Sequence, residues 1–169
     1  DWNELSKENS APFVVAELSK THNYEPIIQV QFFTQSTGLL LRPLDKNTKK
    51  QYKESAIAFV KKYKPRYFGM GIEVNVLYEK SPKEFEEFVV FYNEVYDAIK
   101  VESPTTNVFT SFQLEKMNGL NGGLFGGVND PSKSQWNLLT RFKTDVVAFT
   151  TYPGLIYKEP SEIPQDYYS

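Results

Sequence analysis

The chain has 169 residues, a formal net charge of −2 and no cysteine. One domain with its own core is expected, and neither disulfides nor thiol catalysis is available to it. The charge balance gives no electrostatic attraction for nucleic acid or for an anionic membrane surface. No apolar run approaches the ~20 residues that a membrane span requires. We therefore predict neither a nucleic-acid partner nor a membrane partner.

Helix and strand patterns alternate along the first half of the chain with short connections. Ser10 favours the start of a helix that continues to about Lys20. The compact apolar run 27–34 predicts a strand by its length and its β-branched and aromatic content. Apolar side chains then recur with helical spacing over 48–64, which predicts an amphipathic helix that Pro65 ends.

The segment 67–75, YFGMGIEVN, is the most informative stretch of the chain. Strand side chains alternate between faces, so Gly69, Gly71 and Glu73 share one face and bulky apolar side chains share the other. The bare face leads to a carboxylate at the C-terminal end of the strand. Catalytic groups of alternating β/α chains lie at that end. Glu73 is therefore our principal catalytic candidate, and the alternative is a carboxylate that pairs with Lys or Arg or faces solvent.

The second half continues the alternation. Residues 81–84, SPKE, have the pattern of a capping box with proline in the first turn, and a long amphipathic helix follows. Further strands are expected over 107–113 and 145–152. Between them, the Gly- and Asn-rich segment 118–133 predicts a long loop, which we interpret as a flexible flap over a cleft.

This order of elements predicts an α/β fold with a parallel sheet covered by helices. Right-handed crossovers place the C-terminal ends of all its strands on one side. The sequence shows no internal repeat and no domain linker, so residues 1–169 are expected to form a single domain.

Two of the strand ends resemble one family. Residues 65–75, PRYFGMGIEVN, resemble the fourth barrel strand of the large (β/α)8 glycoside hydrolase clan, in which a Glu at the strand end is the general acid/base. Endo-galactanase-like members are the most similar. Residues 145–153, DVVAFTTYP, resemble the sixth strand of the clan, which ends in a Tyr that touches the nucleophile. The resemblance covers nearly the whole chain in layout, and it implies catalytic roles for Glu73 and Tyr152.

The resemblance implies an incomplete parallel (β/α) barrel of TIM type. Residues 1–2 would close strand two, residues 27–35 would be strand three and residues 107–113 strand five. A whole barrel takes ~250 residues, so we expect 1–169 to be a partial catalytic-type domain with about strands three to six and their helices. Strands one, seven and eight would be missing. Such a fragment would expose strand edges and an apolar face, and we expect it to dimerise or aggregate.

The sequence departs from the clan in two ways. Ile72 stands where the clan usually has the Asn that binds a sugar 2-hydroxyl. Either another residue, such as Gln31 or Asn75, supplies that contact, or this branch handles its substrate differently. The clan's nucleophile is a Glu at the end of strand seven, which lies beyond this chain. We therefore expect these 169 residues to be inactive alone. Glu115 is the one candidate within the chain for a second carboxylate next to Glu73.

By this resemblance the protein is a hydrolase of polysaccharide degradation. It would hydrolyse β-glycosidic bonds in a poly- or oligosaccharide with retention, with Glu73 as general acid/base. No cofactor is implied, and no spacing of His, Cys, Asp and Glu predicts a metal site. A polysaccharide hydrolase favours an extracellular location, and the sugar, the linkage and the oligomeric state stay open. The alternatives are a non-catalytic carbohydrate-binding barrel, which Ile72 favours, and a barrel enzyme of other chemistry.

Polar and aromatic residues near the strand ends are candidates for sugar recognition. Trp2, beside a strand end, is interpreted as a stacking platform, and Trp136, on the apolar side of its helix, as a core residue. The candidate substrate-binding residues are Trp2, Gln31, Gln35, Asn75, Gln113 and Glu115. Polar residues also decorate ordinary loops, and Tyr152 could be a core aromatic, so a structural role is the alternative for each of them.

Overall fold

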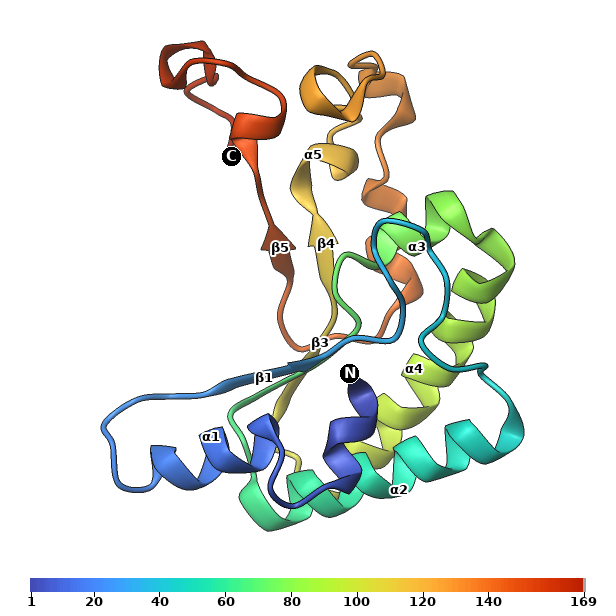
Figure 1. The fold of residues 1–169 in the computed structure, drawn as a ribbon, viewed down its shortest axis with the longest axis vertical. Coiled ribbons are helices and arrows are strands. Elements are labelled where there is room, and N and C mark those ends of the chain that lie inside the picture. Colours follow the sequence, from blue (N-terminus) through green and yellow to red (C-terminus); the bar gives the residue numbers. More distant parts are fainter. Residues whose placement is uncertain (169) are drawn as a thin grey trace.

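The structure is a computed structural model that describes residues 1–168, and it shows an α/β protein (Figure 1). Its strands are β1 (Ile27–Val30), β2 (Tyr67–Met70), β3 (Asn107–Phe109), β4 (Ser111–Gln113) and β5 (Ala148–Thr150). The first three form one sheet in the order β1-β2-β3, and the last two form a second sheet. Every pairing in these two sheets is parallel, as the alternation of helices and strands predicted.

The expected incomplete barrel of TIM type is wrong. The described residues contain short strands in two small sheets, of three and two strands, and no eightfold barrel pattern is evident. One cause lies at Thr110, which divides the expected strand 107–113 into β3 and β4. β3 pairs with β2 and β4 pairs with β5, while the Thr110 hydroxyl donates to the Gly71 carbonyl oxygen at 3.2 Å. The ladder is therefore interrupted at this residue.

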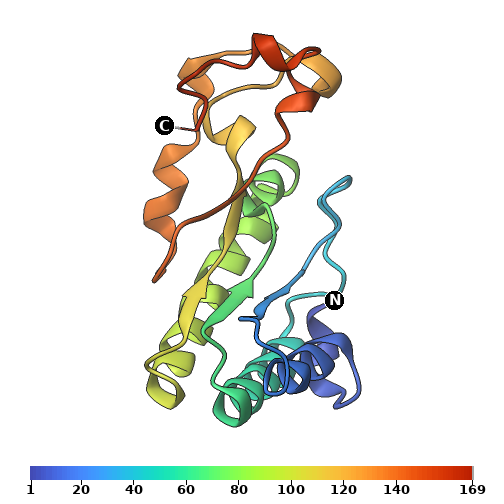
Figure 2. The same ribbon diagram turned by 90° about the vertical axis from the view of Figure 1, so that its left-hand side faces the viewer.

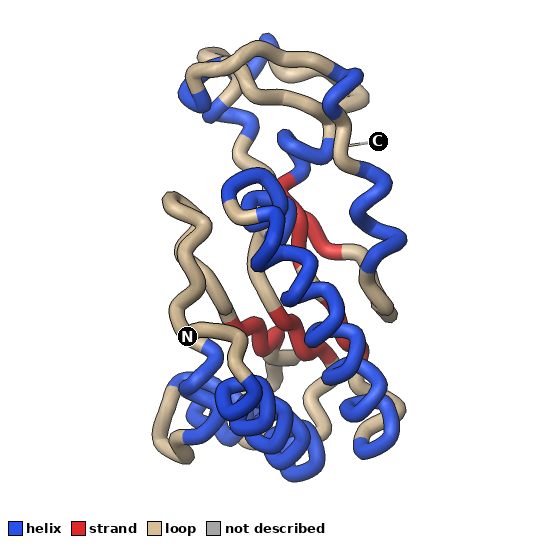
Figure 3. Tube along the Cα trace, turned by 90° about the vertical axis from the view of Figure 1, so that its right-hand side faces the viewer, coloured by secondary structure: helices blue, strands red, loops and turns tan. Residues whose placement is uncertain are grey.

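Helices α1 (Ala11–Ser19), α2 (Lys46–Tyr63) and α4 (Pro82–Glu102) lie together on one side of the three-stranded sheet (Figures 1 and 3). The two short helices are α3 (Val74–Lys80), which precedes α4, and α5 (Leu114–Met117), which continues directly from β4. Short 3₁₀ turns occupy much of the remaining chain, especially after α5. Among residues 1–168, no helix is both long enough and apolar enough to cross a membrane.

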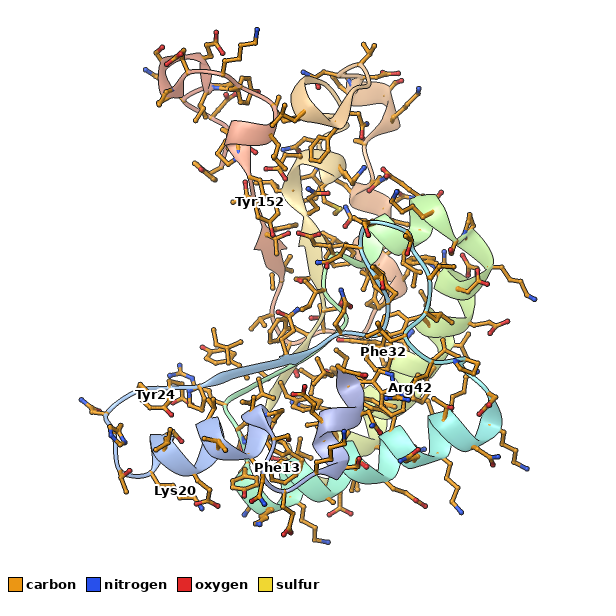
Figure 4. The ribbon with its side chains drawn as sticks, in the orientation of Figure 1. Phe13, Lys20, Tyr24, Phe32, Arg42 and Tyr152 are labelled. Carbon is orange, nitrogen blue, oxygen red and sulfur yellow. The ribbon has the colours of Figure 1, made fainter. Side chains whose placement is uncertain are left out.

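An aromatic core fills the space between the helices and the three-stranded sheet. Trp2 is only 2% exposed and stacks on Phe32, with ring centroids 6.0 Å apart, while the edge of Tyr52 meets it at 5.4 Å. Figure 4 shows Phe32 in this interior, between the strands and α4. Residues 1–2 therefore do not close a strand. Trp2 instead begins a 3₁₀ helix, Trp2–Ser6, that seals the core.

Two helix starts differ from the sequence expectation. Ser81 precedes α4, but its hydroxyl donates to the Gly38 carbonyl oxygen at 3.0 Å, so the capping box is not formed. An additional short helix, α3, begins directly after Glu73, ahead of the long helix that the sequence predicted after residues 81–84. The strand predicted over 27–34 is also shorter, because the regular pairing of β1 ends at Val30.

The bare face of β2 has a packing reason. A Cβ atom on Gly69 would lie 2.7 Å from Gln29 Cγ and 2.8 Å from Phe109 Cζ, so side chains of both neighbouring strands occupy the space that this glycine leaves. Gly71 has a positive φ of 82°, a conformation that L side chains rarely adopt. Glycine at these two positions lets β1 and β3 crowd against β2 and lets the chain turn immediately before Glu73.

We expect Gly69→Ala to lower the free energy of unfolding by about 1–3 kcal/mol, because the added methyl group overpacks the space between Gln29 and Phe109. Gly154→Ala is the matched control, because a Cβ atom there meets nothing within 4 Å. Its effect should stay within about 0.5 kcal/mol. Urea unfolding followed by circular dichroism measures both. Equal stability of the two variants would contradict this account of β2.

Candidate functional site

Glu73 lies between β2 and α3 in a strained backbone conformation. Its φ of 57° and ψ of 49° are left-handed, a conformation that costs about 1–3 kcal/mol for a residue other than glycine. Neighbouring strands hold the chain in this turn. The Gln31 side chain donates to the Ile72 carbonyl oxygen and accepts from the Ile72 amide, both at 3.1 Å, and the Glu73 amide donates to Ser111 Oγ at 3.3 Å. Strain of this kind clusters at functional sites.

The Glu73 carboxylate is buried and has no cationic partner. Glu73 is 5% exposed, and no salt bridge among the described residues includes it. Thr150 Oγ1 donates to its Oε1 at 2.6 Å and Gln35 Nε2 donates to its Oε2 at 3.3 Å. Burial of a carboxylate without a cation is costly, so neutral donors must hold it. Pairing with Lys or Arg, or exposure to solvent, does not describe this residue.

Tyr152 lies just beyond the C-terminal end of β5 (Figure 4). Its hydroxyl interacts with the Glu73 carboxylate. Burial, then the hydrogen bond to Glu73 and the negative charge of Glu73, raise the pKa of the Tyr152 hydroxyl above its ordinary value. The side chain is still 45% exposed, so it is not a core aromatic. The structure therefore brings together the two residues that the sequence suggested as catalytic.

A second carboxylate, Glu115, is enclosed at the start of α5. Its Oε1 accepts hydrogen bonds from Tyr167 Oη at 2.5 Å, from Thr151 Oγ1 at 3.0 Å and from the Tyr152 amide. Its Oε2 is also buried and has no partner among the described residues. Burial, and then the hydrogen bond to Glu115, raise the pKa of the Tyr167 hydroxyl. Glu115 is thus held by three donors of the C-terminal part of the chain.

An open cleft of about 530 Å³ borders Glu73. Side chains from α3 and α5 line it, together with Gln35 and Gln113. Asn121, Phe125 and Gly127 of the Gly-rich segment 118–133 complete the lining. Figures 1 and 2 show this segment near the C-terminal ends of β4 and β5, next to the C-terminal segment. The loop that we interpreted as a flap therefore forms part of the cleft.

A second glutamate of the cleft differs from Glu73 in its electrostatics. Glu79 Oε2 forms an ion pair with Lys116 Nζ at 2.5 Å, and its Oε1 accepts from Gln135 Nε2 at 2.7 Å. A cation thus neutralises the charge of Glu79. Of the two glutamates that line the cleft, Glu79 has a cationic partner, whereas the carboxylate of Glu73 accepts hydrogen bonds from neutral side chains only.

The predicted substrate-binding residues divide into three groups. Gln35 and Gln113 line the cleft. Gln31 and Asn75 are committed to neighbouring backbone groups: Gln31 holds the Ile72 peptide and Asn75 holds the Gln113 peptide.

The remaining candidates lie away from the cleft lining. Glu115 is enclosed by the donors described above, and Trp2 lies in the core. Trp136, which we interpreted as a core residue, is 42% exposed, so the structure reverses the expected positions of the two tryptophans.

Three residues that support the site were not singled out from the sequence. Thr150 lies two residues before Tyr152 and Ser111 two residues before Gln113, so strand alternation around the chosen residues could have found both. Tyr167 follows a Pro-rich tail with no strand or helix pattern, and nothing in the sequence near it points to Glu115.

Within residues 1–168, no group of three or more His, Cys, Asp and Glu side chains could hold a metal ion. The chain matches no protein-family model, no curated protein and no solved structure. Functional conclusions therefore depend on the geometry of the site, and the resemblance to glycoside hydrolases stays a prediction.

We expect the raised pKa values of Tyr152 and Tyr167 to depend on different carboxylates. Glu73→Gln should lower the pKa of Tyr152 toward its ordinary value, because the charge that opposes tyrosinate formation is removed, and should leave Tyr167 nearly unchanged. Glu115→Gln should act mainly on Tyr167. NMR titration of ¹³Cζ-labelled tyrosine measures both groups. Equal shifts of the two tyrosines in either variant would contradict the described contacts.

Proposed function

We propose that Glu73 is the general acid/base of a site that hydrolyses β-glycosidic bonds in a poly- or oligosaccharide with retention. The observation that carries this proposal is a buried carboxylate with no cation partner that borders an open, polar cleft. A titratable side chain that lines a pocket is a candidate for a catalytic position. The volume of the cleft, about 530 Å³, lies within the range of small-molecule sites, roughly 300–1,000 Å³.

In this mechanism Glu73 first protonates the glycosidic oxygen as the bond to the sugar breaks. It then takes a proton from the water that completes hydrolysis. Thr150 and Gln35 donate to different oxygens of the Glu73 carboxylate, which fixes its orientation toward the cleft. Tyr152 lies beside the same carboxylate and orients the second carboxylate that a retaining mechanism needs.

The described residues do not supply that second carboxylate to the cleft. Glu79 lines the cleft but is paired with Lys116, and Glu115 is enclosed by hydroxyl and amide donors. The proposal therefore takes the nucleophile from outside the described residues. It follows that the 169-residue chain should bind β-linked oligosaccharides but should not hydrolyse them unaided.

Carbohydrate binding without catalysis is the second candidate function. The same observation favours it, because the cleft offers one carboxylate that is free of cations. Ile72, in place of a polar residue before Glu73, also favours it. The two functions differ in what an added nucleophile does: a small anion can replace a missing carboxylate in an enzyme, and it does nothing in a binding protein.

The test uses the 169-residue chain with azide as the external nucleophile and a panel of 4-methylumbelliferyl β-glycosides. We expect azide-dependent turnover, in which a carbon–azide bond forms as the glycosidic bond breaks and Glu73 protonates the departing oxygen. Glu73→Gln should slow this turnover by roughly 10²–10⁴-fold, the usual contribution of general acid catalysis. It should spare 2,4-dinitrophenyl β-glycosides, whose leaving group departs without a proton.

Glu79→Gln is the matched control, because it also changes a glutamate of the cleft. Glu79→Gln should change the turnover of the 4-methylumbelliferyl and the 2,4-dinitrophenyl glycosides by the same factor. Equal slowing of both substrates by Glu73→Gln would contradict the acid/base role. Binding of oligosaccharide without azide-dependent turnover in the unmodified chain would favour the binding function instead.

A further inference from the structure

The side chain of Gln113 contributes an amide group to the wall of the cleft. Gln113 is only 4% exposed, and it lines the cleft together with Glu73. Its backbone amide and carbonyl groups are bonded, but its side-chain amide has no hydrogen-bond partner among residues 1–168. The buried side-chain atoms of residues 1–168 that lack a hydrogen-bond partner do not include those of Gln113, so its amide is accessible from the cleft. A ligand in the cleft can therefore form hydrogen bonds with this amide.

Asn75 fixes Gln113 relative to Glu73. Asn75 is fully buried and lies two residues after Glu73 in the first turn of α3. Its Oδ1 accepts from the Gln113 amide at 2.9 Å, and its Nδ2 donates to the Gln113 carbonyl oxygen at 3.0 Å. Nδ2 also donates to Gln135 Oε1 at 3.0 Å, so these bonds occupy the Asn75 amide on both sides. Asn75 therefore positions the Gln113 peptide and is not free to contact a sugar.

The free ends of the Gln113 amide define the chemistry of its partner. The NH₂ group donates and the carbonyl oxygen accepts, a combination that matches two adjacent hydroxyl groups of a sugar ring. We propose that Gln113 binds a vicinal diol of the sugar that lies against Glu73, and that Asn75 is the positioning residue of this contact. This inference rests on the proposed function, because it assumes a carbohydrate in the same cleft.

The experiment follows the side-chain amide signals of Gln113 by ¹⁵N NMR in the 169-residue chain. β-1,4-linked galacto-, gluco- and xylotetraose are the probes, and Gln113→Met identifies the signals. We expect a binding tetraose to shift the Gln113 side-chain signals together with the backbone amides next to Glu73. Gln113→Met, which keeps the volume and removes the amide, should weaken binding roughly tenfold or more. Gln51→Met, at an exposed position of α2, should bind as the unmodified chain does.

Each outcome decides between the two proposals. Shifts next to Glu73, with unchanged Gln113 signals and unchanged affinity of Gln113→Met, would overturn the diol contact and leave the proposed function standing. No binding of any tetraose would overturn both. If Gln113→Met fails to fold, the side-chain shifts of the unmodified chain decide alone. Asn75→Asp gives a separate readout, because it should weaken tetraose binding although Asn75 touches no ligand.

Discussion

The candidate site depends on one short stretch of chain, Thr150–Tyr152, that bonds two buried carboxylates. Thr150 donates to Glu73, and Tyr152 lies against the same carboxylate with its side chain. Thr151 and the Tyr152 amide donate to Glu115 instead. Alternation along an extended chain explains this division, because successive side chains point to opposite sides. A buried carboxylate without partners would be costly. Neutral donors from this one stretch of chain satisfy both carboxylates, with different donors for each.

A second constraint acts on the backbone before Glu73. Gly71 turns the chain at a positive φ, and Gln31 then holds the Ile72 peptide from the side of β1. The Ser111 hydroxyl oxygen, from β4, accepts a hydrogen bond from the Glu73 amide. These bonds come from Gln31, directly after β1, and from Ser111 of β4, which is why a left-handed Glu73 can persist. The backbone also holds the turn, because the Gly71 amide donates to the Val30 carbonyl oxygen at 2.8 Å.

The sequence allowed the local structure to be predicted better than the architecture. The amphipathic patterns over 48–64 and after Pro82 correspond to α2 and α4, and the parallel direction of the strands followed from their alternation with helices. The barrel that we also predicted from the sequence is absent from the described residues. A strand pattern over 107–113 carries no sign that Thr110 divides it between two sheets, because the pairing partners of a strand are chosen by tertiary contacts.

The site was predictable where it depends on strand alternation and not where it depends on distant contacts. Glu73 and Tyr152 were both recognisable as strand-end residues. The burial of Trp2 depends on Phe32 and Tyr52, and the enclosure of Glu115 depends on Tyr167, which is far away in the sequence. Asn75 was predicted as a substrate-binding residue, and its side chain is instead bonded to the Gln113 peptide of β4.

Affinity labelling tests the central claim most directly. An N-bromoacetyl β-glycosylamine carries a nitrogen at the position of the glycosidic oxygen and its reactive bromomethyl carbon two bonds beyond it. A carboxylate that faces the glycosidic oxygen displaces bromide from this carbon and is alkylated. The account predicts that peptide mass spectrometry finds the label on Glu73, that a bound β-linked tetrasaccharide prevents it, and that Glu115 stays unmodified. Label on Glu115 or Glu79 in place of Glu73, or label spread over exposed glutamates regardless of added sugar, would contradict it.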